Sequence, residues 1–97
     1  MRTIKAKELK KWMSENKDFQ LIDVRSENEF KEKHIPGALL IPMDQIPNQL
    51  KLIEKNKPIV IYCLSGIRSF KTALYLKQEL NLEEVYNLKG GIIMWSA

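Results

Sequence analysis

The sequence predicts an α/β fold built on a parallel β-sheet. Short apolar segments rich in isoleucine and valine alternate with segments whose apolar residues recur every three or four positions, the pattern of strands alternating with helices. Residues 59–62 are apolar or aromatic throughout, as is typical of a central parallel strand buried on both faces. A length of 97 residues suits one small domain, and we expect a single domain over residues 1–97.

The first half of the chain contains two expected strand–helix units. The pattern predicts an edge strand near Ile4, a helix over residues 6–16, a buried strand over residues 19–24 and a short helix over residues 26–33. The start of the second helix is marked by Ser26 and Glu29, which have the spacing of a capping box.

The second half continues the alternation. The pattern predicts a strand over residues 38–41, a helix over residues 43–53, a strand over residues 59–62, a helix over residues 69–80, a strand over residues 84–88 and a last helix from residue 92. Pro47 removes a helix hydrogen-bond donor, which favours a division of residues 43–53 into two pieces.

The composition excludes several classes of partner. The net charge of +4 comes mostly from lysine, but no basic face with interleaved aromatic residues is evident, so we expect no nucleic-acid partner. No apolar run reaches the roughly 20 residues of a membrane-spanning helix, so we expect no membrane partner. The first residues lack a secretory signal, and one cysteine cannot form an internal disulfide. We therefore expect a cytoplasmic protein, monomeric by default.

Cys63, the only cysteine, follows the predicted strand 59–62 and precedes the predicted helix 69–80. A thiol at the N-terminal end of a helix meets unpaired N–H groups and about half a positive elementary charge. Such surroundings can lower a thiol pKa from about 8.5 to roughly 3.5–7.5. Cys63 is therefore a candidate nucleophile, although an inert buried cysteine is the alternative. Asp23, 40 residues earlier, also ends a predicted strand and is expected at the same sheet edge.

The loop after Cys63 has the composition of an anion-binding cradle. Its successive N–H groups can turn toward one negatively charged atom, as they do in a backbone nest. Gly66 permits a positive φ angle, and Arg68 adds a permanent charge. Ser69 is expected to cap the helix or to donate to the sulfur. The candidate binding residues are Leu64, Ser65, Gly66, Ile67, Arg68 and Ser69.

Five short motifs in this order and spacing resemble the rhodanese family of sulfurtransferases. They are Asp23-Val24-Arg25, Glu29-Phe30, His34-Ile35-Pro36-Gly37-Ala38, Cys63-x-x-Gly66-x-Arg68-Ser69 and Gly90-Gly91 with Trp95. The resemblance covers nearly the whole chain. It implies a five-stranded parallel sheet with helices on both faces.

The resemblance implies a sulfurtransferase that carries sulfane sulfur as a persulfide on Cys63. The donor would be a small molecule such as thiosulfate. The acceptor would be cyanide in an assay, or a thiol or protein in the cell. No metal or organic cofactor is implied. The family pattern further suggests that Asp23 supports the loop and helps to hold Arg68, while Arg25 and Glu29 form a structural ion pair and His34 is structural.

Two other functions remain open from the sequence. A non-catalytic member of the family would act as a sulfur carrier or binding module. Cysteine phosphatases and arsenate reductases use a similar loop, but phosphatases place five residues between cysteine and arginine, whereas four lie between Cys63 and Arg68. The shorter loop favours binding of a single sulfur atom.

Overall fold

The computed structural model describes residues 1–97. Its strands are β1 (Arg2–Ile4), β2 (Gln20–Asp23), β3 (Leu39–Leu40), β4 (Ile59–Tyr62) and β5 (Val85–Leu88). Its helices are α1 (Ala6–Ser14), α2 (Glu27–Glu32), α3 (Ile67–Leu80) and α4 (Gly91–Ser96), with two 3₁₀ helices, η1 (Met43–Asn48) and η2 (Leu50–Leu52). None of these helices combines the length and apolar character needed to cross a lipid bilayer.

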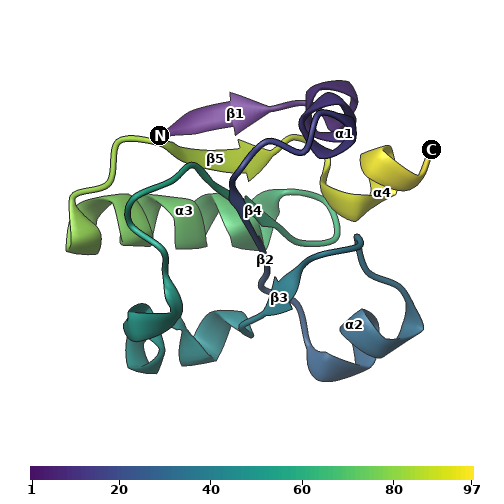
Figure 1. Ribbon diagram of the computed structural model, residues 1–97. Coiled ribbons are helices and arrows are strands. Elements are labelled where there is room, and N and C mark those ends of the chain that lie inside the picture. The colour runs from purple at the N-terminus through teal and green to yellow at the C-terminus, as the bar shows by residue number, and fades with distance from the viewer.

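The five strands form one parallel sheet in the order β1-β5-β4-β2-β3, as the sequence predicted. β4 lies at the centre, flanked by β5 and β2. Because every strand runs in the same direction, the carboxyl ends meet at one edge. Figure 1 shows α1 and α4 close together at this edge, beside the loop that leaves β4.

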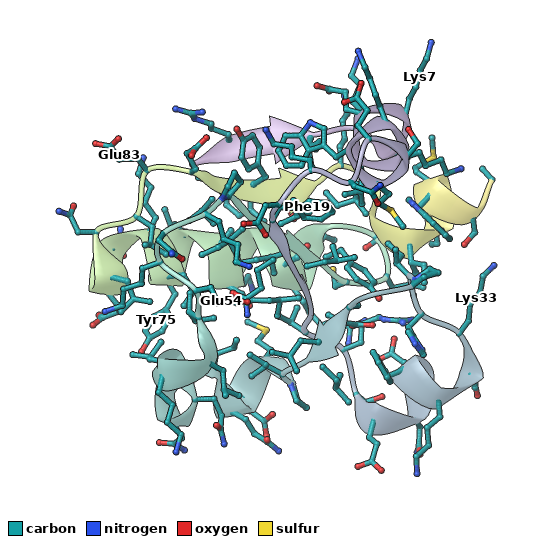
Figure 2. All side chains as sticks on the ribbon, in the orientation of Figure 1. Lys7, Phe19, Lys33, Glu54, Tyr75 and Glu83 are labelled. Atoms are coloured by element: carbon teal, nitrogen blue, oxygen red, sulfur yellow. The ribbon has the colours of Figure 1, made fainter.

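Side-chain alternation divides the core into two layers on opposite faces of the sheet. One layer, which we call the α3 face, contains Ile59, Ile61 and Cys63 of the β4 segment and packs against α3 and η1. The other layer, the α1/α4 face, contains Val60 and Tyr62 and packs against α1 and α4. Charged side chains such as Lys7, Lys33 and Glu83 point outward around the rim, whereas Phe19 is partly buried and packs against the core (Figure 2).

The segment 43–53 forms two helical pieces, as Pro47 led us to expect, but both pieces are 3₁₀ helices. It forms η1 and η2, and the division falls at Gln49 rather than at Pro47. Pro47 lies inside η1, where the N–H of Gln49 still reaches the carbonyl of Ile46 at 3.0 Å. With these tight turns, Ile46 within η1 and Ile53 directly after η2 both enter the core.

The helix 6–16 ends at Ser14, two residues earlier than expected, and helix 69–80 begins at Ile67, two residues earlier than expected. The capping box before α2 is present, with the Ser26 hydroxyl accepting from the Glu29 N–H and the Glu29 carboxylate accepting from the Ser26 N–H.

Tyr62 ties β4 to the segment between α2 and β3, and this contact gives a stability prediction. Its fully buried hydroxyl accepts a hydrogen bond of 3.1 Å from the Ile35 N–H. Tyr62→Phe leaves that buried N–H without a partner, so we expect the free energy of unfolding to fall by about 1–3 kcal/mol in urea titrations. Tyr75→Phe is the control, because the half-buried Tyr75 makes no side-chain hydrogen bond. Equal losses in the two variants would contradict this role for the hydroxyl.

Candidate active site

The loop of residues 63–66 joins the central strand β4 to α3 at the carboxyl edge of the sheet. Cys63 continues the alternation of β4, so its side chain points to the α3 face. Only 1% of the residue is exposed. The sulfur therefore lies on the floor of the loop.

Three hydrogen-bond donors converge on the Cys63 sulfur. The Gly66 N–H lies 3.1 Å from Sγ, the Ser69 N–H lies 3.4 Å away and the Ser69 hydroxyl oxygen lies 3.3 Å away. Burial raises the pKa of the thiol, but the Ser69 hydroxyl and the backbone N–H groups of Ser69, Gly66 and Ser65 lower it. The lowering prevails, and the pKa of Cys63 lies below its ordinary value.

Helix α4 orients the peptide groups of the loop. The Ile92 N–H donates to the Cys63 carbonyl at 3.0 Å, and the Ile93 N–H donates to the Leu64 carbonyl at 3.2 Å. The N–H of a trans peptide points away from its carbonyl, so these bonds turn the following N–H groups away from α4 and toward the interior of the loop. At Gly91 an added Cβ would lie 2.3 Å from the Leu64 carbonyl oxygen, so only glycine permits this approach.

Gly66 has the positive φ that its position in the loop predicted. Its φ is 104°, and it is the residue immediately before α3. A side chain at this angle is strained, although its Cβ would meet the backbone nitrogen of Gly90 at 3.4 Å without a clash. The turn at Gly66 directs its own N–H at the sulfur.

Two charge pairs differ from the expected partners. Asp23 does not hold Arg68: its carboxylate pairs with Arg25, whose Nη2 lies 2.8 Å from Oδ2 and whose backbone N–H lies 2.9 Å from Oδ1. Arg25 does not pair with Glu29. Instead Glu29 binds Arg68 through two hydrogen bonds of 2.9 and 3.0 Å.

The faces of the sheet explain this exchange of partners. Asp23 pairs in register with Tyr62, so both side chains lie on the α1/α4 face, and Arg25 stacks over the Tyr62 ring. Cys63 lies on the opposite face. Asp23 and Cys63 thus share the carboxyl edge, as predicted, but the sheet separates the buried Asp23–Arg25 pair from the sulfur.

The Glu29–Arg68 pair links α2 to the first turn of α3. The Arg68 guanidinium, with help from the Ser26 N–H, lowers the pKa of Glu29 to about 2 against the opposing effect of burial. The pair is partly open to solvent, with 40% of the Arg68 side chain and 30% of the Glu29 side chain exposed. Two of the five guanidinium N–H donors serve Glu29, and the others remain available.

A hollow of about 730 Å³ lies beside the loop rather than over the sulfur. The loop residues Ser65, Gly66 and Ile67 form part of its wall, whereas Cys63 does not line it. Its charged lining residues are Lys5, Lys71, Lys89 and Glu8. The hollow therefore carries a positive balance next to the loop.

Comparison with known proteins identifies the family. The model of the rhodanese-like domain matches residues 5–97. The chain belongs to this family. A sulfurtransferase from Allochromatium vinosum is 39% identical over 93 residues, covering 96% of this chain and 86% of that protein. The thiosulfate sulfurtransferase GlpE of Coxiella burnetii is 33% identical over 90 residues, covering 92% of this chain and 83% of that protein.

Solved structures agree with the family assignment. The crystal structure of a rhodanese-like domain protein from Staphylococcus aureus matches this fold with a TM-score of 0.88 and 41% identity. The match covers 98% of this chain and 91% of the Staphylococcus aureus chain. The five-stranded parallel sheet expected from the motifs is therefore confirmed as a rhodanese-like fold.

The other candidate residues differ in whether their side chains face the sulfur or the solvent. The side chains of Leu64 and Ile67 point outward, with 43% and 67% exposed, so any binding by these residues falls to their backbone. Ser69 does not cap α3, contrary to one expectation, and instead contacts the sulfur. Phe70 is 48% exposed and lines the hollow beside the loop.

His34 lies apart from the rhodanese-like loop. Its Nδ1 is 2.8 Å from the Phe30 carbonyl oxygen, and its ring stacks on Phe30 with 3.8 Å between centroids. It makes no hydrogen bond to Cys63. The role expected for it as a structural residue is consistent with these contacts.

Sequence reasoning missed the contacts of two residues, one with the first turn of α3 and one with the loop. Glu29 was assigned to the wrong partner, although its distance of three residues from Ser26 did place it correctly in the capping box. Asn87 on β5 is buried and donates to the Gly66 carbonyl at 3.1 Å, yet it was read only as part of a strand. A polar amide within an otherwise apolar strand was the available signal for Asn87.

The Glu29–Arg68 pair predicts a pH-dependent stability. Glu29→Gln keeps an oxygen for the capping box but removes the charge that binds Arg68. Since the folded pKa of about 2 lies below the ordinary 4.5, the pair stabilises the fold above pH 4.5 and loses this effect as the pH falls toward 2. Allowing for solvent exposure, we expect a loss of about 1 kcal/mol in the free energy of unfolding at pH 7.

Urea titrations at several pH values test this loss. The parent and Glu29→Gln should converge as the pH falls toward 2. Glu27→Gln is the matched control on the same helix, because Glu27 pairs only with Lys31 and both side chains are about 70% exposed. A loss at Glu29 that stays constant with pH, or that Glu27→Gln reproduces, would contradict the assigned pair.

Proposed function

We propose that the protein transfers a sulfane sulfur from a donor such as thiosulfate to a thiophilic acceptor through a persulfide on Cys63. The observation that carries the proposal is that the Gly66 N–H and the Ser69 N–H both lie within 3.4 Å of the sulfur, with the Ser69 hydroxyl oxygen also 3.3 Å from it. These donors favour the thiolate, the nucleophilic form of cysteine. The names of the relatives from Allochromatium vinosum and Coxiella burnetii point to the same chemistry.

In the first step, the Cys63 thiolate attacks the outer sulfur of thiosulfate. A new S–S bond forms between Cys63 and that sulfur. The S–S bond of thiosulfate breaks, and its electron pair leaves with sulfite. The outer sulfur of the resulting persulfide carries the negative charge at neutral pH and replaces the thiolate as the acceptor of loop hydrogen bonds.

In the second step, a thiophilic acceptor attacks the outer sulfur of the persulfide. Cyanide yields thiocyanate, and a thiolate yields a new persulfide. In either case the electron pair of the broken S–S bond returns to Cys63 as the thiolate. No external oxidant or reductant is needed, because the sulfur atom passes from the donor to the acceptor and Cys63 returns to the thiolate.

Positive charge near the loop supports an anionic donor. Arg68 keeps guanidinium N–H groups beyond the two that bind Glu29, and these can meet the anionic head of thiosulfate. Lys5, Lys71 and Lys89 in the neighbouring hollow outnumber Glu8 and raise the local concentration of anions. Because Cys63 is 1% exposed, the loop has to admit the outer sulfur of the donor before the attack.

A persulfide carrier that requires a partner protein would use the same loop, and a phosphatase would use a similar one. Four residues lie between Cys63 and Arg68, and the N–H groups of Gly66 within this loop and of Ser69 just after Arg68 already point at the sulfur. This geometry supports sulfur over phosphate. We also propose a cytoplasmic location, where the single thiol stays reduced.

Sulfur loading tests the proposal directly. After incubation with thiosulfate, intact-mass measurement is expected to show a gain of one sulfur atom, and Cys63→Ser is expected to abolish both this gain and thiocyanate formation from thiosulfate and cyanide. Residual turnover in Cys63→Ser would place the nucleophile elsewhere. Loading without thiocyanate formation would favour a carrier, and turnover of an aryl phosphate as fast as thiosulfate would favour a phosphatase.

A further inference from the structure

Asn87 is a buried amide whose two ends both contact the active-site loop. It is 8% exposed and lies on β5 between Tyr86 and Leu88. A buried amide is costly unless its polar atoms are hydrogen-bonded. Here Nδ2 donates to the Gly66 carbonyl at 3.1 Å, and Oδ1 accepts from the Ser69 hydroxyl at 2.5 Å.

The sheet places Asn87 directly under the loop. Asn87 pairs in register with Ile61 of β4, and both side chains lie on the α3 face. Cys63 follows two residues later on that same face. The amide therefore reaches the first turn of α3 from the neighbouring strand, across 18 and 21 sequence positions to Ser69 and Gly66.

The two contacts fix the orientation of the amide. A carbonyl oxygen can only accept, so the group that faces the Gly66 carbonyl must be the Asn87 NH₂. Oδ1 then faces Ser69, and since Oδ1 carries no proton, the Ser69 hydroxyl must donate to it. This hydroxyl also lies 3.3 Å from the Cys63 sulfur.

A hydroxyl has one proton and can donate it to one acceptor at a time. While Ser69 donates to Asn87, its oxygen presents lone pairs to the sulfur and can accept the S–H of a thiol. For Ser69 to donate to a thiolate, the hydroxyl must turn away from Asn87. Asn87 and the Cys63 thiolate thus compete for the same proton.

We propose that Asn87 is a positioning residue for Cys63, with an amide oxygen that competes with the sulfur for the Ser69 proton and an amide nitrogen that holds the Gly66 carbonyl. In this arrangement Asn87 favours the thiol at rest. The backbone N–H groups of Gly66 and Ser69 remain the donors that favour the thiolate. The catalytic meaning of this balance rests on the proposed function, but the balance itself can be measured without a sulfur donor.

Charged groups around the loop do not share in this competition. They are Arg68 and Lys71 on α3, Glu29 on α2, the Asp23–Arg25 pair at the end of β2, Asp44 on η1, Lys89 after β5, Lys5 before α1 and Glu8 on α1, while α4 has no charged side chain. Arg68 is the one whose charge interacts with Cys63, and Glu29 holds it in place. None of these groups hydrogen-bonds to Ser69 or Asn87.

Asn87→Leu removes the competing acceptor while keeping a side chain of similar size. The Gly66 carbonyl stays paired, because it also accepts from the Phe70 N–H at 3.1 Å. The rate of Cys63 alkylation by iodoacetamide, measured against pH, gives the midpoint of thiol ionisation. We expect Asn87→Leu to lower this midpoint by about 0.5 to 1 pH unit, the size of one hydrogen bond.

A double-mutant cycle separates this mechanism from general loosening. Ser69→Ala is expected to raise the midpoint, and Asn87→Leu should then have no further effect in the Ser69→Ala background. Gln20→Leu is the matched control: Gln20 is also a buried strand amide bonded at both ends, to Leu52 and Glu54, but at the opposite edge of the sheet. It is expected to leave the midpoint unchanged.

Three results would overturn the proposal. They are an unchanged or raised midpoint in Asn87→Leu, a shift that persists without the Ser69 hydroxyl, and an equal shift in Gln20→Leu. If Asn87→Leu does not fold, Asn87→Val removes the same acceptor with a side chain that suits a strand, and the same outcomes apply. If the midpoints shift as expected but Cys63 does not take up sulfur, the proposed function is rejected and the role of Asn87 stands.

Discussion

The hydrogen bonds from α4 to the carbonyl groups of Cys63 and Leu64 are the constraint on which the site depends. Without them the loop carbonyls would be free to turn toward the sulfur and repel a thiolate. The bonds require the backbone of α4 to approach the loop closely, and Gly91 provides the necessary space. The last helix therefore contributes no reactive group, yet it sets the direction of the peptide dipoles around the nucleophile.

The sheet also separates two ion pairs that have different roles. On the α1/α4 face, the buried Asp23–Arg25 pair satisfies its own charges and also binds the Lys33 carbonyl at 2.6 Å, which anchors the end of α2. On the α3 face, the half-open Glu29–Arg68 pair holds the start of α3 near the same helix. A buried pair gives rigidity, whereas an open pair leaves donors for an incoming anion. Helix α2 is thus fixed from both sides of the sheet.

The sequence was sufficient to predict the alternation of strands and helices and the place of Cys63, because residues 59–62 and the loop after them have strong local patterns. It did not reveal the partners of Asp23 and Glu29. Residues 20–25 are all buried, so their composition does not show whether Asp23 and Arg25 lie on the same face of the sheet as Cys63, and that follows only from the register with β4. The 3₁₀ form of residues 43–53 likewise depends on contacts with the sheet. Asn87 has its role because the loop that follows the neighbouring strand, β4, lies against its side chain.

The recessed sulfur also determines how two copies of the chain can meet. A disulfide requires two sulfur atoms about 2.05 Å apart and two Cβ atoms about 3.8 Å apart. A cysteine that is 1% exposed on the floor of a loop offers a second copy no surface on which to reach this geometry. Burial therefore disfavours a disulfide between two copies of the chain, while a small donor still has a far easier approach to the sulfur than a second protein surface has.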